Sequence, residues 1–404
     1  RNTATGMFAL LTNKTGSHNT AHGFYAAGST CSGCFNTASG AYALAVNTTA
    51  NLNTAVGFCA LFANTTGAKN TASGGYSMKA NTTGCRNVAY GYDSLGLNTT
   101  GCRNVSVGVS SMQCNTTGNG NTASGHYSLR FNTTGNCNTA HGYEALKSNT
   151  TASDNTAVGS CVLHSNTTGA NNIALGFQAL RVNTTGHKNT GTGNYALYSN
   201  TTGGCNVATG YQALYANTTA GGNTASGYRA LYANTTGHNN TAYGRAGLYT
   251  NTTGLRNTAV GMLASYLNTT GSQNTASGYY AMGKTTTGSH NTASGYFALT
   301  LNTTGAKNTA YGYRSGCSNT SGACNVYLGY IANGGGGINN AVAIGYCATA
   351  AATNDFILGN SSHQLDIPSA KLKVGGSAGS NGQVLTTDGA GGVSWTTASY
   401  SGTG

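Results

Sequence analysis

Acidic residues are the first place to look for chemistry in this sequence. There are six of them: Asp93, Glu144, Asp154, Asp355, Asp366 and Asp388. Asp93 and Glu144 stand at equivalent positions of a seventeen-residue repeat, three copies apart. If each copy adds one strand spacing, they lie about 14 Å apart, farther than the carboxylate pairs of glycoside hydrolases. No acidic cluster suits calcium. We therefore expect no enzyme, no cofactor and no metal site.

Histidine and cysteine are the next candidates. The nine His residues are scattered without a paired acid, so we interpret them as surface residues. Of the twelve Cys residues, Cys31 and Cys34 form "CSGC", a dithiol or metal spacing, but no second such pair exists and a decorated turn is favoured. Cys85 and Cys102 occupy equivalent positions in adjacent copies, close enough for a disulfide. Their side chains are expected to point in parallel, which favours free thiols.

Glycosylation sequons recur in the same place in seventeen copies of the repeat. Among them are Asn47, Asn64, Asn81, Asn98, Asn217, Asn234 and Asn251. One interpretation is an N-linked glycan on each turn of a rod. The other is a turn residue followed by two Thr residues that serve the fold. The second is favoured for a bacterial or phage protein, and the first for a eukaryotic or giant-virus product.

Aromatic and basic residues also recur at fixed positions. Five Tyr residues follow one another in adjacent copies: Tyr198, Tyr215, Tyr232, Tyr249 and Tyr266. They are interpreted either as packing, within or between chains, or as a platform for glycans, with Lys147 and Arg181 at the same position to meet acidic groups. The net charge is +12, and many basic residues share another position. Interruptions in that stripe favour solubility over a specific nucleic-acid partner.

The repeat that positions all these residues has a constant length. An Asn recurs every seventeen residues from Asn2 to Asn325, twenty times without insertion or deletion. We number the repeat as columns 1 to 17 from this Asn; its consensus is N-T-A-x-G-Y-x-A-L-x-x-N-T-T-G-x-x. A fixed step of this kind indicates copies stacked in register, that is, a solenoid.

The composition restricts the solenoid to β structure. Gly, Asn and Thr are abundant, and no helical apolar stripe is present. Columns 1–6 and 7–11 are predicted strands, and columns 12–17 a return turn. Ladders of hydrogen bonds are expected from the Asn of column 1, as in Asn223 and Asn240, and from the Thr of columns 13 and 14. Column 5 is always Gly, as in Gly57, Gly125 and Gly227, either for a left-handed backbone or for close approach between coils.

The core of one turn is expected to be thin, with one Ala, one small residue and one Leu or Met. Columns 2 and 4 are apolar in some copies, including Val88, Ile173 and Leu175. We therefore expect several chains to share a core, most simply as a homotrimer. The predicted divisions are a repeat shaft over 1–338, a capping or neck segment over 339–374 and a Gly-rich tail over 375–404. No apolar run is long enough to span a membrane, and Arg1 falls in column 17 of a preceding copy, which suggests a piece of a longer or processed chain.

Two family resemblances follow from these motifs. Residues 339–359, "NNAVAIGYCATAAATNDFILG", resemble the head repeats of trimeric autotransporter adhesins of the YadA type, and "NTAxG" resembles a polar version of the same motif. This resemblance implies a left-handed, trimeric β-roll. The whole phrase and the ending "GSNGQVLTTDGAGGVSW" at 380–395 resemble repeat regions of phage and virus tail-fibre proteins. In that family such an ending often precedes a self-cleaving chaperone.

The functional expectation is a structural fibre. The shaft would project or attach a virion to a host-cell surface or polysaccharide, in an extracellular or virion-surface location. A bacterial adhesin or extracellular matrix filament, with or without glycans, is the alternative. An ice-binding solenoid is a third candidate, because Thr ladders on a flat face order water, but the variable columns 4, 7 and 10 count against it.

Overall fold

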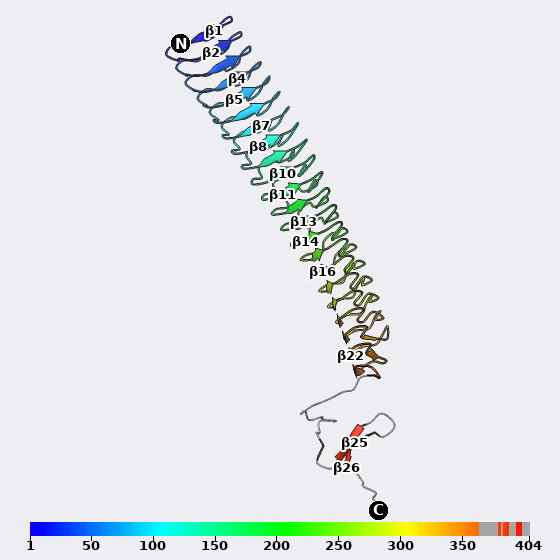
Figure 1. Cartoon of the computed structure of the whole chain (residues 1–404). Coiled ribbons are helices and arrows are strands. Elements are labelled where there is room, and N and C mark those ends of the chain that lie inside the picture. The colour runs from blue at the N-terminus through cyan, green and yellow to red at the C-terminus, as the bar shows by residue number, and fades with distance from the viewer. Residues whose placement is uncertain (363–378, 381–382, 388–392, 398–404) are drawn as a thin grey trace, which may run out of the picture.

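The protein is an all-β solenoid, as the repeat predicts (Figure 1). The computed structural model describes residues 1–362, 379–380, 383–387 and 393–397. Twenty strands of three residues follow the seventeen-residue step. They are β1 Thr3–Thr5, β2 Thr20–His22, β3 Thr37–Ser39, β4 Thr54–Val56, β5 Thr71–Ser73, β6 Val88–Tyr90, β7 Val105–Val107, β8 Thr122–Ser124, β9 Thr139–His141, β10 Thr156–Val158, β11 Ile173–Leu175, β12 Thr190–Thr192, β13 Val207–Thr209, β14 Thr224–Ser226, β15 Thr241–Tyr243, β16 Thr258–Val260, β17 Thr275–Ser277, β18 Thr292–Ser294, β19 Thr309–Tyr311 and β20 Val326–Leu328.

The strands form one parallel sheet along the rod. Each residue of columns 2 to 4 pairs with the residue seventeen positions later, as Ala225 of β14 does with Ala242 of β15. The predicted second strand is absent: columns 6 to 11 form turns instead. Backbone hydrogen bonds still join these turns from one coil to the next, for example from the Leu44 N–H to the Ala60 carbonyl at 2.9 Å.

Left-handed backbone positions bend each coil. Besides the Gly of column 5, non-Gly residues in columns 7, 9 and 17 have positive φ, as in Tyr42 (57°), Leu44 (53°) and Lys69 (64°). Such angles are unfavourable for bulky residues. The Leu of column 9 is nevertheless retained over Gly because its side chain fills the core, so burial offsets the backbone strain.

The core is a narrow channel within a single chain. The residues of columns 3, 8 and 9, such as Ala38, Ala43 and Leu44, are fully buried in almost every turn. Columns 2 and 4 face outward, because strand residues alternate between the two faces of a sheet. Val56, Ile173 and Leu175 are therefore exposed on the outer face. The small core is thus closed by one chain alone, and a shared core is not needed to enclose it.

Two ladders of buried Asn side chains line this core. In column 1, Asn223 Oδ1 accepts the Asn240 backbone N–H at 2.8 Å, and its Nδ2 donates to the Gly237 carbonyl at 2.9 Å. In column 12, Asn81 Nδ2 donates to Asn64 Oδ1 at 2.8 Å and to the Gly84 carbonyl at 3.0 Å. The column 1 ladder confirms its prediction. The column 12 ladder was not expected.

The Thr positions differ from each other. In column 13, the Thr48 hydroxyl donates to the Thr65 carbonyl of the next coil at 3.1 Å, as predicted. In column 14, Thr49 is exposed, and no ladder forms among the Thr residues of that column in the part of the chain that the structure describes. The prediction of a ladder there was wrong, because these side chains point into solvent.

The sheet continues beyond the regular repeat into the segment predicted to cap the shaft. β22 (Val342–Ile344) pairs with β20 and then with β24 (Phe356–Leu358), after steps of sixteen and fourteen residues. β21 (Asn333–Gly334) pairs with β23 (Thr349–Ala350). Separately, β25 (Gln383–Thr387) and β26 (Val393–Thr397) form an antiparallel hairpin. Parts of the predicted divisions 339–374 and 375–404 lie outside the described residues. Asp366 and Asp388 also lie outside them.

An unusual core residue marks the end of the regular repeat. Tyr327 occupies column 3, where Ala is the rule, and is fully buried. Space for its ring comes from Gly316 and Gly334, since a Cβ at either position would contact that ring. A large residue in one coil is thus matched by missing side chains in its neighbours.

The part of the chain that the structure describes has no helix with the length and apolar character needed to span a membrane.

Candidate functional site

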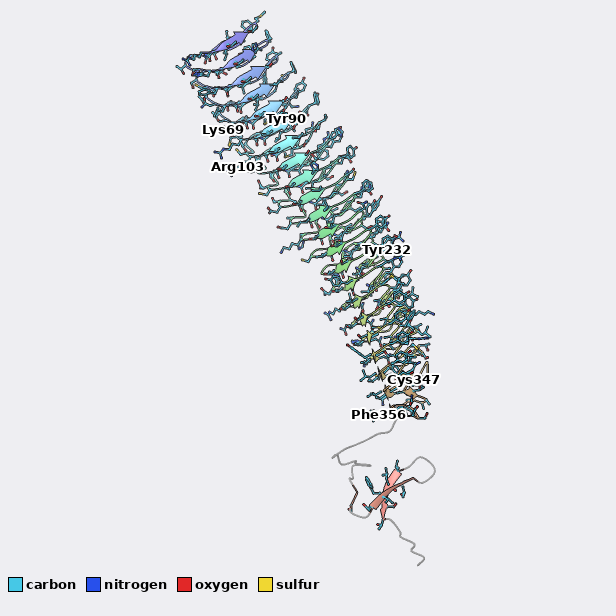
Figure 2. All side chains as sticks on the ribbon, in the orientation of Figure 1. Lys69, Tyr90, Arg103, Tyr232, Cys347 and Phe356 are labelled. Carbon is cyan, nitrogen blue, oxygen red and sulfur yellow. The ribbon has the colours of Figure 1, made fainter. Side chains whose placement is uncertain are left out.

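The five Tyr residues of column 10 form a continuous stack. Its central member, Tyr232, lies on the side of the rod opposite Lys69 and Arg103 (Figure 2). Neighbouring ring centroids are 5.1–5.3 Å apart, and the planes differ by 7° to 19°. The stack follows from the fold, because one coil adds one strand spacing and places each ring over the last. Each ring is half-buried. We refer to Tyr198, Tyr215, Tyr232, Tyr249 and Tyr266 as the tyrosine ladder.

Stacking determines what the tyrosine ladder can offer to a ligand. In an offset stack the faces of the inner rings are covered by their neighbours. The exposed parts are therefore ring edges and phenol hydroxyls, repeated once per coil. Partial burial and the adjacent Tyr198 and Tyr232 raise the pKa of Tyr215. The Tyr215 hydroxyl is thus a neutral hydrogen-bond donor and acceptor at physiological pH.

Arg181 closes the N-terminal end of the tyrosine ladder. Its Nη1 donates to the Tyr198 hydroxyl at 3.1 Å, and its guanidinium carbon lies 6.0 Å from the ring centroid. Among the described residues, Arg181 has no ion-pair partner within 4 Å. Its guanidinium is therefore available to pair with an anionic group of a ligand.

A charged cluster precedes Arg181 along the same face. Lys147 Nζ lies 2.7 Å from Glu144 Oε1, and His164 Nε2 lies 3.3 Å from Glu144 Oε2. Partial burial alone would raise the pKa of Glu144, but Lys147 and His164 outweigh it and the pKa is lowered. Partial burial, together with Lys147 and Arg181, lowers the pKa of His164 despite its carboxylate partner. The interpretation of every His as lacking an acid was wrong for His164, because the coil brings columns 7 and 10 of successive turns together.

A second polar group lies nearer the N-terminus on this face. Lys79 Nζ is 3.0 Å from Asp93 Oδ1, and Gln113 donates to the other oxygen of Asp93. Arg130 Nε then donates to Gln113 Oε1 at 2.9 Å. Asp93 is therefore held by partners within the fold, and it does not face Glu144 as a second carboxylate.

A second ring stack was not found from the sequence. In column 6, Tyr279, Tyr296, Tyr313, Tyr330 and Tyr346 stack with centroids 5.1–5.4 Å apart. A shallow cavity of about 270 Å³ lies beside it, lined by Tyr296, Phe297, Thr300, Tyr313 and Arg314. The sequence contained a signal for this stack, because four of these rings recur in column 6 of consecutive regular copies.

The sequons do not present their Asn side chains. The predicted acceptors are fully buried: Asn47, Asn64, Asn81, Asn98, Asn217, Asn234 and Asn251. Their amide nitrogens belong to the column 12 ladder, as the Asn217 bond to Asn200 Oδ1 at 2.8 Å shows. A glycan on this nitrogen is incompatible with the folded coil. The interpretation of these sequons as glycan sites is therefore corrected, because the motif serves the ladder.

The Gly residues of column 5 meet both demands that the sequence left open. Gly57, Gly125 and Gly227 have φ of 124°, 138° and 136°. A Cβ on Gly227 would also lie 2.6 Å from the Gly244 carbonyl oxygen of the next coil. The backbone conformation and the close approach between coils therefore both require Gly.

The remaining chemistry is sparse. All twelve cysteines are free, and within the described ranges no three His, Cys, Asp or Glu side chains are grouped to hold a metal ion. The column 17 residues Lys69, Arg86 and Arg103 are exposed.

Comparison with models of known protein families finds no match to this chain, and comparison with curated proteins finds none either. Function must therefore be argued from the geometry.

Proposed function

We propose that this protein is the shaft of a fibre that projects or attaches a virion to a surface, in the manner of a tail fibre. The observation behind this proposal is a single sheet of 22 parallel strands. At about 4.8 Å per strand, it spans roughly 100 Å. Such a solenoid encloses little volume and gains length with every copy. A structural role outside the cell or on the virion surface suits it better than catalysis.

We further propose that the shaft is a homotrimer. One support is the resemblance to trimeric adhesin and tail-fibre repeats. The other is the outer sheet face, which carries Thr and Ser in most coils but becomes apolar in the last three. The residues of this apolar end are Val326, Leu328, Val342, Ile344, Phe356 and Leu358. Phe356 is 64% exposed and Leu328 45%, so copies of the same chain would cover apolar area there.

Attachment is proposed to run along the tyrosine ladder, with a host polysaccharide as the partner. Each coil offers one weak contact, and repetition supplies avidity. Because the ring faces are covered, the contacts are hydrogen bonds from sugar hydroxyls to phenol hydroxyls. Arg181 would add an attraction for acidic sugars.

A matched pair of variants tests this attachment. Replacing Tyr215, Tyr232 and Tyr249 together with Phe keeps the stack and removes three hydroxyls. We expect this variant to lose binding on a glycan array, while replacing Tyr296, Tyr313 and Tyr330 with Phe leaves it unchanged. Unaltered binding by the first variant would exclude the tyrosine ladder as the attachment surface.

The shaft itself is tested by imaging. Antibodies against the repeat should label rods on virions in electron micrographs. Label on bacterial surfaces instead would contradict the virion proposal and favour an adhesin.

A further inference from the structure

Column 16 has a recurring hydrogen bond that brings two cysteines together. In this column a side chain often accepts the backbone N–H of the same column in the preceding coil. Asn119 Oδ1 accepts from Cys102 at 2.8 Å, and Asn136 Oδ1 accepts from Asn119 at 2.8 Å. Cys102 has the same role one coil earlier, since its Sγ accepts the Cys85 N–H at 3.0 Å. Because Cys85 is itself a column 16 residue, the two sulfurs are neighbours.

The sulfur atoms of Cys85 and Cys102 lie 2.9 Å apart. The backbone beside them is fixed, because the Arg103 N–H donates to the Cys85 carbonyl at 3.0 Å. Adjacent coils are separated by about 4.8 Å, which lies within the range of Cα separations that a disulfide spans. Both residues are partly exposed, so a small reagent can reach them. The sequence favoured free thiols on the ground of parallel side chains, but here the two side chains converge.

We propose that Cys85 and Cys102 form a reversible disulfide between adjacent coils when the protein meets a small-molecule disulfide such as oxidised glutathione. The thiolate of Cys102 attacks one sulfur of glutathione disulfide and releases one glutathione thiolate. Cys85 then loses its proton, and its sulfur attacks Cys102 and releases the second glutathione. Two protein thiols are oxidised, and one glutathione disulfide is reduced to two thiols.

The surroundings support this order of events. The backbone N–H of Cys85 points at the Cys102 sulfur and stabilises negative charge there. The hydrogen bond to Cys102, burial and the charge of Cys102 raise the pKa of Cys85, and Arg86 and Arg103 oppose this rise. Cys102 is thus the first nucleophile, and Cys85 ionises as it closes the bond.

Cys34 is a natural control in the same column. Its Sγ accepts the Ser17 N–H at 3.3 Å, as Cys102 does from Cys85. Its neighbours in column 16 are Ser17 and Asn51, so that column places no second sulfur beside it, and Cys31, three residues earlier, lies in column 13. This hydrogen bond lowers the pKa of Cys34. Cys34 should therefore react with glutathione disulfide but stop at the mixed disulfide.

The experiment uses the whole chain in buffers of defined oxidised and reduced glutathione, followed by alkylation, denaturation and trypsin. Cleavage after Lys79, Arg86 and Arg103 yields peptides 80–86 and 87–103, each with one cysteine. We expect these two peptides to be joined, with the loss of two hydrogens. Cys34 lies in one tryptic peptide, 15–69, with Cys31 and Cys59, and this peptide should carry glutathione with no disulfide formed at Cys34. Excess reductant should reverse both products.

The variant Cys85→Ser makes the surroundings of Cys102 equivalent to those of Cys34. It should give only the glutathione adduct at Cys102. Glutathione adducts on both Cys85 and Cys102 of the unaltered chain, without the joined peptide, would overturn the proposal. So would a joined peptide no more abundant than links among the other ten cysteines.

Discussion

At the scale of single residues, the cluster of Glu144, Lys147 and His164 predicts how the stability of the fold depends on pH. Both the carboxyl and the imidazole have lowered pKa values in the folded chain. A lowered folded pKa means that the unfolded state binds the proton more readily, so stability falls as pH falls. The loss begins below the ordinary His pKa of about 6.5 and continues below the ordinary Glu pKa of about 4.3.

We predict that Lys147→Met raises the pKa of both Glu144 and His164, because Lys147 lowers both. Selectively labelled His in NMR titrations would report this change directly. An unaltered His164 titration in the variant would show that Lys147 does not contribute to its lowered pKa.

Tyr327 allows a second prediction at this scale. Its hydroxyl is buried with no hydrogen-bond partner among the described residues, and burial raises its pKa to about 12. An unpaired buried hydroxyl costs about 1–3 kcal/mol, and the small space left by its removal offsets part of the gain. Tyr327→Phe should therefore raise the free energy of unfolding by about 1 kcal/mol.

Thermal or denaturant unfolding would measure this change, with the exposed Tyr330→Phe as a neutral control. The raised pKa adds a check at alkaline pH. The stability linked to the raised pKa of Tyr327 is fully present below the ordinary Tyr pKa of about 10. It is lost as the pH rises toward the pKa of Tyr327 in the folded chain. Tyr327→Phe should remove that part of the alkaline loss. A destabilised variant would mean that the hydroxyl has a partner.

At the scale of one coil, the sequon has two separable parts. Asn98 Nδ2 donates to Asn81 Oδ1 at 2.7 Å, and Asn98 Oδ1 accepts from Asn115 at 2.8 Å. Asn98→Ala should destabilise the rod by about 1–3 kcal/mol for each buried partner left unpaired. Thr100→Ala destroys the same sequon but changes an exposed side chain. It should leave stability unchanged. If both variants were equally destabilised, the ladder would not be the reason for the motif.

Gly227→Val tests the contact between coils. The φ of 136° and the Gly244 carbonyl 2.6 Å from the added Cβ both oppose a side chain. We expect a loss of a few kcal/mol, as for other strained or overpacked positions. Gly75→Ala is the matched control, because its Cβ would meet only Tyr92 at 3.6 Å. Equal melting of the two variants would show that Gly in column 5 is incidental.

The coil also shows which features a sequence reveals. The solenoid, the column 1 ladder and the Gly of column 5 were predicted because their cause is periodic and repeats in every copy. The column 12 ladder was missed because a buried Asn and a glycosylation sequon have the same letters. The Glu144–His164 pair was missed because the contact depends on side-chain directions between coils. For Cys85 and Cys102 the closeness of the two residues and their free thiols were predicted, but the direction of the side chains was misjudged for the same reason.

At the scale of the whole molecule, the outer sheet face is the feature that one chain leaves open. The core of columns 3, 8 and 9 is complete within the chain, so the proposed trimer would use other surfaces. The apolar end around Leu328, Phe356 and Leu358 is costly to leave in water. A trimer joined there would also set the chains in register for the rest of the rod.

We predict that native mass spectrometry of the intact chain gives a trimer, and that replacing Leu328, Phe356 and Leu358 with Ser gives monomers. Circular dichroism should remain unchanged, because these side chains point away from the core. The control replaces Val105, Ile173 and Leu175 with Ser, on the same face but far from the apolar end, and should remain trimeric. A stable monomer of the unaltered chain would contradict the trimer. Monomers from both variants would mean that the interface runs along the whole sheet, since one continuous contact would then lose area at either place.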